Sequence, residues 1–258
     1  VLKFTGLKRG MLVSSACASS SSALAQGAML IQSGQISSCL VLAVDAVSEF
    51  VFSGFSALMA MDKNRARPFD QNRMGLSLGE AAGFILLMGA GRAKQEKIEP
   101  LAQIAGWGSS CDANHMTGPS RTAQGLIRAI DTALSRAKLI PDAIGGISSH
   151  GTGTLYNDAM ELYAYKKIFK NKPVPIYSVK GGAGHTLGAA GLIETILTLQ
   201  VLKTRVVPGT VGLTDIDQQA LGWASPEAKK LKKSALILNN CGFGGVNTAL
   251  ILKKIQQD

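Results

Sequence analysis

Short apolar runs alternate along the chain with longer stretches in which apolar and polar residues recur at helical spacing. The short runs predict strands at residues 11–13, 39–44, 84–88, 101–107, 145–149, 175–179, 235–239 and 248–252. The longer stretches predict helices over residues 18–32, 48–62, 121–138 and 158–169, and an apolar helix that follows the loop at 181–188 and ends near 202. This alternation is typical of an α/β protein whose sheets are covered on both faces. The first strand–helix–strand unit predicts parallel strands joined by a right-handed crossover.

A charged stretch at residues 91–99 separates the elements before it from those after it. Its polar composition indicates a boundary between two units, residues 1–98 and 99–258. Near the end of the second unit, the last two predicted strands flank a glycine-rich turn and are expected to form a hairpin.

Composition narrows the class of protein. The 258 residues are 46% hydrophobic and 17% charged, which suits a globular protein with a substantial core. No run reaches the roughly 20 apolar residues that cross a bilayer, and residues 1–30 lack the layout of a secretion signal, so no membrane span is expected. The cysteines lie far apart and form no CxxC pair: Cys17, Cys39, Cys111 and Cys241. A disulfide framework or zinc site is therefore not expected, and a reducing cytoplasm is the simplest location.

The net charge of +10 indicates an acidic partner, which could be nucleic acid, a membrane surface or an acidic carrier protein. Two lysine clusters supply much of this charge: Lys166, Lys167, Lys170 and Lys172, and Lys229, Lys230, Lys232 and Lys233. For each cluster, a solvated face is a better interpretation than a specific binding site.

Cys17 is the first candidate for chemistry. It lies where the strand at 11–13 is expected to end and the helix at 18–32 to begin. Free N–H groups and the positive end of the dipole at a helix N-terminus favour a thiolate and lower the cysteine pKa from about 8.5. Cys17 is therefore a candidate nucleophile, although most lone cysteines are small buried apolar residues.

The three histidines add a second kind of group. His150 and His185 each follow a predicted strand inside a glycine-rich loop, whereas His115 lies in a polar loop. Two such histidines beside a cysteine at a third strand end form a constellation suited to acyl transfer through a thioester. A metal site is the weaker interpretation, because no carboxylate or cysteine lies at ligand spacing from either histidine.

These residues sit in a series of motifs that resembles a known family. The motifs are Ser14-Ser-Ala-Cys17-Ala-Ser, Pro68-Phe-Asp70 with Arg73, Gly79-Glu80, Asp112-Ala-Asn-His-Met-Thr117, His150-Gly-Thr-Gly-Thr154 with Asn157-Asp158 and Glu161, Lys180 with Gly184-His185-Thr-Leu-Gly-Ala-Ala-Gly191, and Gly242-Phe-Gly-Gly245. In this order they resemble the β-ketoacyl-[acyl-carrier-protein] synthases, and most closely the Cys-His-His condensing enzymes of the synthase I/II type.

The resemblance implies the layered αβαβα fold of the thiolase-like superfamily. Residues 1–98 would be the rear part of the N-terminal, nucleophile half, which would be incomplete in this chain. Residues 99–258 would be the whole C-terminal half, which carries both histidines. We expect the upstream segment of the family to be a separate chain, to have been cleaved, or to lie outside this sequence.

The resemblance also implies catalytic roles. Cys17 would carry the acyl chain as a thioester, and the backbone N–H groups of Cys17 and Phe243 would form the oxyanion hole. His150 and His185 would stabilise the enolate formed when carbon dioxide leaves malonyl carrier protein. Lys180 would position His185 and pair with Glu194; a purely structural ion pair is the alternative for these two residues.

Further roles follow from the same resemblance. Thr152, Thr154, Phe243 and Gly244 would bind the phosphopantetheine arm and the acyl chain, and Asp158 and Glu161 would support the site. Phe243 would gate the acyl pocket together with a loop that holds Asp112, His115 and Thr117. For His115, a plain surface loop is an equal alternative. The protein itself would bind no cofactor and no metal, because phosphopantetheine arrives on the carrier protein.

The activity implied is a decarboxylative Claisen condensation that yields a 3-oxoacyl carrier protein in fatty-acid, polyketide or aryl-polyene synthesis. The expected partners are acidic acyl carrier protein and a second synthase chain in a homodimer or heterodimer, with no nucleic acid. One alternative is a non-catalytic partner subunit or half-enzyme of a condensing complex. Another is an oxidoreductase that binds a dinucleotide at Gly182-Ala-Gly184 and Gly188, but no acidic residue follows where a ribose ligand belongs.

Overall fold

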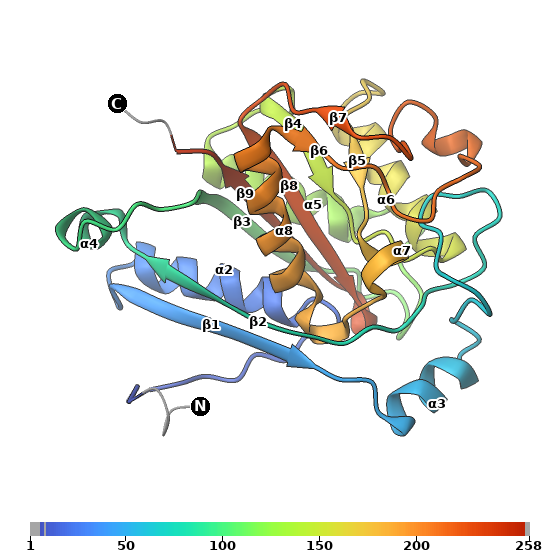
Figure 1. Ribbon diagram of the computed structural model, residues 1–258, viewed down its shortest axis with the longest axis horizontal. Coiled ribbons are helices and arrows are strands. Elements are labelled where there is room, and N and C mark those ends of the chain that lie inside the picture. The colour runs from blue at the N-terminus through green and yellow to red at the C-terminus, as the bar shows by residue number, and fades with distance from the viewer. Residues whose placement is uncertain (1–5, 8, 256–258) are drawn as a thin grey trace.

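A five-stranded mixed sheet forms the centre of the computed structural model, which describes residues 6–7 and 9–255 (Figure 1). Its strands lie in the order β3-β9-β8-β4-β5. Their bounds are β3 Gln103–Cys111, β4 Ile144–Ser148, β5 Ile176–Tyr177, β8 Ala235–Gly242 and β9 Val246–Lys253. Strands β3, β9 and β8 pair antiparallel, and β8, β4 and β5 pair parallel. The predicted hairpin of the last two strands is confirmed.

Helices cover both faces of this sheet because its strands are apolar on both sides. Helices α5 (Gln124–Ala137) and α6 (Leu155–Ile168) pack on one face and bury Leu126, Ile130 and Leu162 there. Helices α2 (Ser19–Gln32) and α8 (Ala190–Thr204) pack on the other face, where Leu24, Leu192 and Leu250 share a core. Figure 1 shows α8 in front of the sheet and α5 behind it.

A second, two-stranded sheet lies on the far side of α2 (Figure 1). Its strands, β1 (Ser38–Asp45) and β2 (Ala81–Met88), pair antiparallel, and their side chains alternate largely between partly buried and exposed. Apolar side chains on its outer face are exposed: Leu42, Val44, Phe84 and Leu86. The expectation that every sheet is covered on both faces is therefore wrong for this one in the described chain. The described layers are β, α, β and α.

The segment before Cys17 also differs from its prediction. Residues 11–13 are extended but belong to no strand, and Leu12 is 92% exposed. A strand needs a neighbouring backbone to pair with, and β1 pairs only with β2 among the described residues. The predicted parallel pair around α2 is therefore not formed.

The predicted helix at 48–62 and the apolar helix after 181–188 are both present. The first is shorter than predicted, and short turns precede the second. The first is α3 (Glu49–Ala57), which begins at the N-cap Ser48 and buries no residue. The second is divided into the single turn α7 (Lys180–Ala183), a 3₁₀ turn at Leu187–Ala189, and α8.

The remaining elements are short. The predicted boundary contains α4 (Ala90–Gln95), and β6 (Val206–Val207) pairs with β7 (Lys229–Lys230). Three further 3₁₀ turns lie at Pro141–Ala143, Gln218–Ala220 and Phe243–Gly245. One stretch, Leu187–Thr204, is long and apolar enough to cross a membrane, but 56% of it is buried inside the fold, as is usual for a core helix.

Candidate active site

Cys17 lies in a tight turn directly before α2. Ala16 has a φ of 47°, and an isolated bridge joins Ser15 to Cys17. The hydroxyl of Ser19 holds the turn, since it accepts from the Ser15 N–H at 2.8 Å and donates to the Ala16 carbonyl at 2.6 Å. The turn therefore fixes the Cys17 thiol at the start of a helix, as the sequence predicted.

The charge state of Cys17 differs from the prediction of a thiolate. Burial raises the pKa of the thiol to about 11, while Lys180 and hydrogen bonds from the N–H groups of Phe243 and Cys17 lower the pKa by less. The helix N-terminus does not compensate for the loss of solvent around the sulfur. The resting group is a thiol, so a nearby base must take its proton when it reacts.

His150 follows β4, and its backbone is held by a buried carboxylate. Glu161, on α6, accepts hydrogen bonds from the His150 and Gly151 N–H groups, both at 2.7 Å. Three more donors reach the same carboxylate, from Asn157, Tyr165 and Asn239. This network fixes the start of the glycine-rich loop and agrees with the supporting role predicted for Glu161.

His185 is held from the other side by the loop before β2. Its N–H donates to the Ser77 carbonyl at 2.6 Å, and its carbonyl accepts from the Gly79 N–H at 3.0 Å. Gly184 has a φ of 74°, and a Cβ at this position would lie 2.5 Å from the Leu78 carbonyl oxygen. Only glycine therefore lets the chain pass here and present His185 to the site.

The two imidazoles meet edge to face, with ring centroids 5.1 Å apart and planes at 83°. Burial, and then the positive charge of Lys180, hold the pKa of both rings well below the ordinary 6.5, and His185 lowers the pKa of His150 further. Both rings are therefore neutral at pH 7, so each has one N–H to donate and one nitrogen able to accept a proton.

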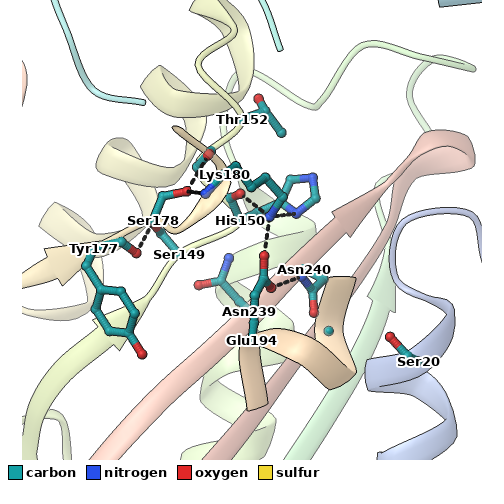
Figure 2. A network of polar contacts seen from close by, with 12 residues as sticks. Ser20, Ser149, His150, Thr152, Tyr177, Ser178, Lys180, Glu194, Asn239 and Asn240 are labelled. Atoms are coloured by element: carbon teal, nitrogen blue, oxygen red, sulfur yellow. Dashed lines mark hydrogen bonds and ion pairs between the residues drawn. The ribbon is translucent and has the colours of Figure 1, made fainter. Parts of the chain in front are cut away.

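Lys180 forms a buried ion pair with Glu194, as predicted (Figure 2). The histidine that it contacts is His150, whereas the prediction named His185. Its ammonium donates to the His150 carbonyl at 2.5 Å and lies 3.5 Å from the His150 Nδ1. His185 Nδ1, also buried, has no hydrogen-bond partner in the described chain. The prediction that Lys180 positions His185 is therefore wrong in its contact, because the α7 turn directs the lysine toward β4.

The loop after His150 is braced by Asp158. This carboxylate accepts from the N–H groups of Phe69, Thr152 and Gly153, and it faces Arg73 at 3.6 Å. The hydroxyls of Thr152 and Thr154 lie 2.8 Å apart. Asp158 thus joins the 150–154 loop to the loop around Phe69, and the two threonines face the cavity.

A cavity of about 440 Å³ joins these groups, and its lining includes Cys17, His150 and His185. The predicted gating residues also line it: Asp112, His115, Thr117 and Phe243, together with Thr152, Thr154 and Gly245. Gly244 is exposed beside it and has a φ of 83°. The structure thus brings the predicted site residues of both halves of the chain to one place.

Two loops meet at the mouth of this cavity. The Gly244 N–H donates to the Met116 carbonyl at 2.7 Å, and Asp112 accepts from the Asn247 side chain at 2.9 Å. His115 uses Nδ1 to accept from the Thr117 and Gly118 N–H groups. Hydrogen bonds therefore tie the loop of Asp112, His115 and Thr117 to the turn that carries Phe243.

Three residues of the site were not predicted from the sequence: Phe55, Asn239 and Asn240. Phe55 of α3 stacks on Phe243, with ring centroids 5.7 Å apart. Asn239 and Asn240 of β8 donate to the buried Glu161 and Glu194, respectively. A signal for the asparagines was present: two adjacent amides interrupt a strand that is otherwise apolar, and buried amides need partners.

The competing site hypotheses find little support. The loop proposed for a dinucleotide holds the buried Lys180 and His185, and its backbone is bonded to residues 77–79 rather than open to a ligand. In residues 6–7 and 9–255, no group of three or more His, Cys, Asp or Glu residues is arranged to hold a metal ion. Seven of the eight clustered lysines are exposed and Lys166 is half-buried, as expected of a solvated face.

Comparison with known families covers both halves of the chain. Residues 2–93 match the family model of the beta-ketoacyl synthase N-terminal domain, and residues 101–214 match that of the C-terminal domain. The chain belongs to the β-ketoacyl synthase family. Its fold is therefore thiolase-like, as predicted, and the order of its motifs reflects common descent.

Among curated relatives, this synthase chain is similar to a 3-oxoacyl-[acyl-carrier-protein] synthase homolog of Saccharomyces cerevisiae, at 33% identity over 260 residues. That match covers 94% of the chain and 58% of the relative. The chain thus spans about three-fifths of the length of such a relative.

Solved structures of ketosynthases superpose closely on the synthase chain. A ketosynthase in complex with its chain length factor from Xenorhabdus doucetiae has a TM-score of 0.90 and 34% identity, and covers 98% of this chain and 62% of its own. A ketosynthase in complex with a type II polyketide acyl-carrier protein has a TM-score of 0.93 and 26% identity, with 99% and 65% covered.

Proposed function

We propose that the protein is a 3-oxoacyl-[acyl-carrier-protein] synthase that extends a thioester-bound acyl chain by decarboxylative condensation. The observation that carries this proposal is the cavity shared by one thiol, Cys17, and two neutral imidazoles, His150 and His185. Acyl transfer needs a nucleophile such as the thiol, and decarboxylation needs hydrogen-bond donors to the developing enolate oxygen, which neutral imidazoles can supply. The three groups together support both half-reactions.

In the first half-reaction, the Cys17 sulfur attacks the carbonyl carbon of an acyl thioester. A neutral imidazole accepts the thiol proton and then gives it to the departing pantetheine thiolate, which leaves as a thiol. The N–H groups of Phe243 and Cys17, which already lower the pKa of the Cys17 thiol, would stabilise the oxyanion. Loss of one such donor commonly costs about 3 kcal/mol.

In the second half-reaction, a malonyl thioester loses carbon dioxide, and the electrons of the broken bond form an enolate. N–H groups of His150 and His185 donate to the enolate oxygen. Lys180 lies 3.5 Å from His150 Nδ1, so this nitrogen is the acceptor and Nε2 carries the proton to be donated.

The enolate carbon then attacks the acyl carbonyl on Cys17, and the carbon–sulfur bond breaks. The sulfur leaves as a thiolate and regains a proton, which restores the resting thiol. The product is a 3-oxoacyl thioester two carbons longer. Thr152 and Thr154, on the cavity wall, would hydrogen-bond the pantetheine arm, and Phe243 with Gly244 would border the acyl chain.

An acidic acyl carrier protein is the proposed substrate carrier, and a related synthase chain, identical or not, is the proposed dimer partner. Structures of a ketosynthase with its acyl-carrier protein and of another with its chain length factor support these assignments. We further propose a cytoplasmic location, division into two halves at residue 98, and no resident cofactor. We also propose that a further polypeptide segment, which the longer relatives possess, covers the exposed outer face of β1 and β2.

A non-catalytic partner subunit is the second candidate, since chain length factors occur in the similar complexes. The presence of Cys17, His150 and His185 in one cavity favours catalysis. Carbon dioxide release from malonyl carrier protein tests the choice. If the protein is the proposed enzyme, the parent protein releases carbon dioxide and the His185→Ala variant does not. If it is a non-catalytic subunit, neither the parent protein nor the variant releases carbon dioxide.

A further inference from the structure

Two adjacent asparagines in β8 lie beneath the candidate active site. Both are fully buried, in a strand whose preceding residues are apolar. Because neighbouring side chains in a strand point to opposite faces, Asn239 and Asn240 approach different helices. Asn239 reaches Glu161 on α6. Asn240 reaches Glu194 on α8 (Figure 2).

Each asparagine donates to a different buried glutamate. Asn239 Nδ2 lies 2.8 Å from Glu161 Oε1, and Asn240 Nδ2 lies 2.7 Å from Glu194 Oε2. Glu161 accepts the His150 N–H, while Glu194 pairs with Lys180, which donates to the His150 carbonyl. The two networks therefore hold the two ends of the same residue.

We propose that Asn239 and Asn240 are a pair of positioning residues for His150, and that Asn240 acts by keeping Glu194 ionised, so that Glu194 holds the Lys180 ammonium against His150. This proposal rests on the proposed condensing function. It assigns no contact with substrate to either asparagine.

The surroundings of Asn240 indicate that its donor is the important part of the side chain. Its Oδ1 is buried and has no hydrogen-bond partner in the described chain, which is unfavourable for a polar atom. A Cβ on Gly191 would lie 2.6 Å from this oxygen, so the glycine of α8 leaves the room that the amide needs. An apolar residue would avoid the cost of the unpaired oxygen but would leave one Glu194 oxygen without a donor.

The charge on Lys180 connects Asn240 to the cavity. When the amide donor is lost, Glu194 binds a proton more readily, and a protonated Glu194 no longer holds the Lys180 ammonium beside His150 and Cys17. Lys180 lowers the pKa of Cys17, His150 and His185. The pKa of all three groups should then rise, although none of them contacts Asn240.

Alkylation of Cys17 by iodoacetamide from pH 7 to 10, followed by digestion and mass spectrometry of the peptide that contains Cys17, measures this effect without any substrate. The peptide resolves Cys17 from the exposed Cys111. In the complete protein, Asn240→Leu should slow alkylation at pH 8 by at least about threefold, the effect of half a pKa unit on the thiolate fraction. Thr195→Val is the matched control. It removes a buried hydroxyl that donates to the Gly191 carbonyl, one turn from Glu194, and no hydrogen bond joins this hydroxyl to Lys180 or Asn240 in the described chain, so its rate should equal the parent rate.

A double variant separates positioning from general damage. In a Glu194→Gln background, Asn240→Leu should have no further effect on the rate, because the carboxylate through which it acts is gone. Unchanged alkylation in Asn240→Leu, an equal effect of Thr195→Val, or an independent effect in the Glu194→Gln background would each overturn the proposal. Asn240→Ala replaces the leucine variant if thermal unfolding shows that the latter does not fold.

The same preparation separates this inference from the proposed function. If the parent protein is acylated on Cys17 by an acyl carrier thioester but Asn240→Leu leaves the alkylation profile unchanged, only the positioning role fails. If the profile shifts as expected but the parent protein takes no acyl group, only the condensing function fails.

Discussion

The ring of His150 meets the ring of His185 edge to face, with centroids 5.1 Å apart. His150 comes from the end of β4 and His185 from the turn before α8, so two separate segments place their imidazoles against one cavity. Both rings are buried and lie near the positive charge of Lys180, and they therefore stay neutral. A pair of neutral donors suits an oxygen that becomes negative during the reaction.

The neutral histidines predict a loss of stability in mild acid. Their pKa is lowered in the folded state, so below about pH 6.5 the unfolded chain binds protons that the folded chain does not, and stability falls as the pH falls. If both rings stay neutral to pH 5, each removes about 2 kcal/mol of unfolding free energy.

Urea unfolding of the complete protein between pH 5 and 8 measures this loss. His185→Gln should remove the share of the pH dependence that this ring contributes; comparison with the parent protein cancels the opposite contribution of buried Asp158, whose pKa is raised to about 6. The same pH dependence in the parent protein and in His185→Gln would contradict a neutral ring.

Cys17→Gln is expected to separate the two half-reactions. Glutamine cannot accept an acyl group, so condensation should stop, but the histidines that stabilise the enolate remain. Release of carbon dioxide from malonyl carrier protein should persist. If the variant folds normally but releases no carbon dioxide, the thiol is needed for decarboxylation as well, which would contradict the proposed mechanism.

Glu161→Gln should destabilise the protein, because Glu161 accepts hydrogen bonds from five donors and a glutamine amide would face some of them with its own N–H groups. The expected loss of unfolding free energy is about 3 kcal/mol. Chemical denaturation measures it. Glu96→Gln, in an exposed pair with Arg92, is the control and should cost less than about 1 kcal/mol.

Much of the fold was predictable, because buried strands and amphipathic helices have distinct apolar periods. The central sheet, α2, α5 and α6 follow directly from such runs. The absence of a strand at residues 11–13 was not predictable. A strand is defined by its pairing, and an apolar run does not show whether a partner strand is present. Likewise, the exposed face of β1 and β2 carries apolar residues such as Val44, which the pattern predicts to be buried.

For the site, loops after strands indicated His150 and His185 correctly, since parallel strand ends meet at one edge. Cys17 was indicated by the helix that follows it, because residues 11–13 form no strand. The partner of Lys180 could not be read in this way, because the single turn α7 decides which histidine the lysine reaches. The pKa of Cys17 was missed for a similar reason. Its rise to about 11 comes from burial by segments distant in sequence, which outweighs the local helix terminus.

Phe55→Ala should loosen the packing of Phe243, the residue predicted to gate the cavity. The two rings stack, and such a pair contributes about 1 kcal/mol beyond its buried area, which corresponds to roughly fivefold in an equilibrium. Cys17 should therefore react up to about fivefold faster with iodoacetamide at fixed pH. Phe50→Ala, at a ring on the same helix that is 87% exposed, should react as the parent does. Equal rates in all three proteins would show that the Phe55–Phe243 stack does not restrict access to Cys17.

Acylation of Cys17 tests the central claim most directly. The complete protein is incubated with an acyl-carrier thioester and digested, and the peptide that contains Cys17 is weighed by mass spectrometry. The account predicts one acyl group on Cys17, absent from Cys17→Ala and released when malonyl carrier protein is added. An unmodified Cys17 in folded protein, or an acyl group that malonyl carrier protein does not release, would contradict it.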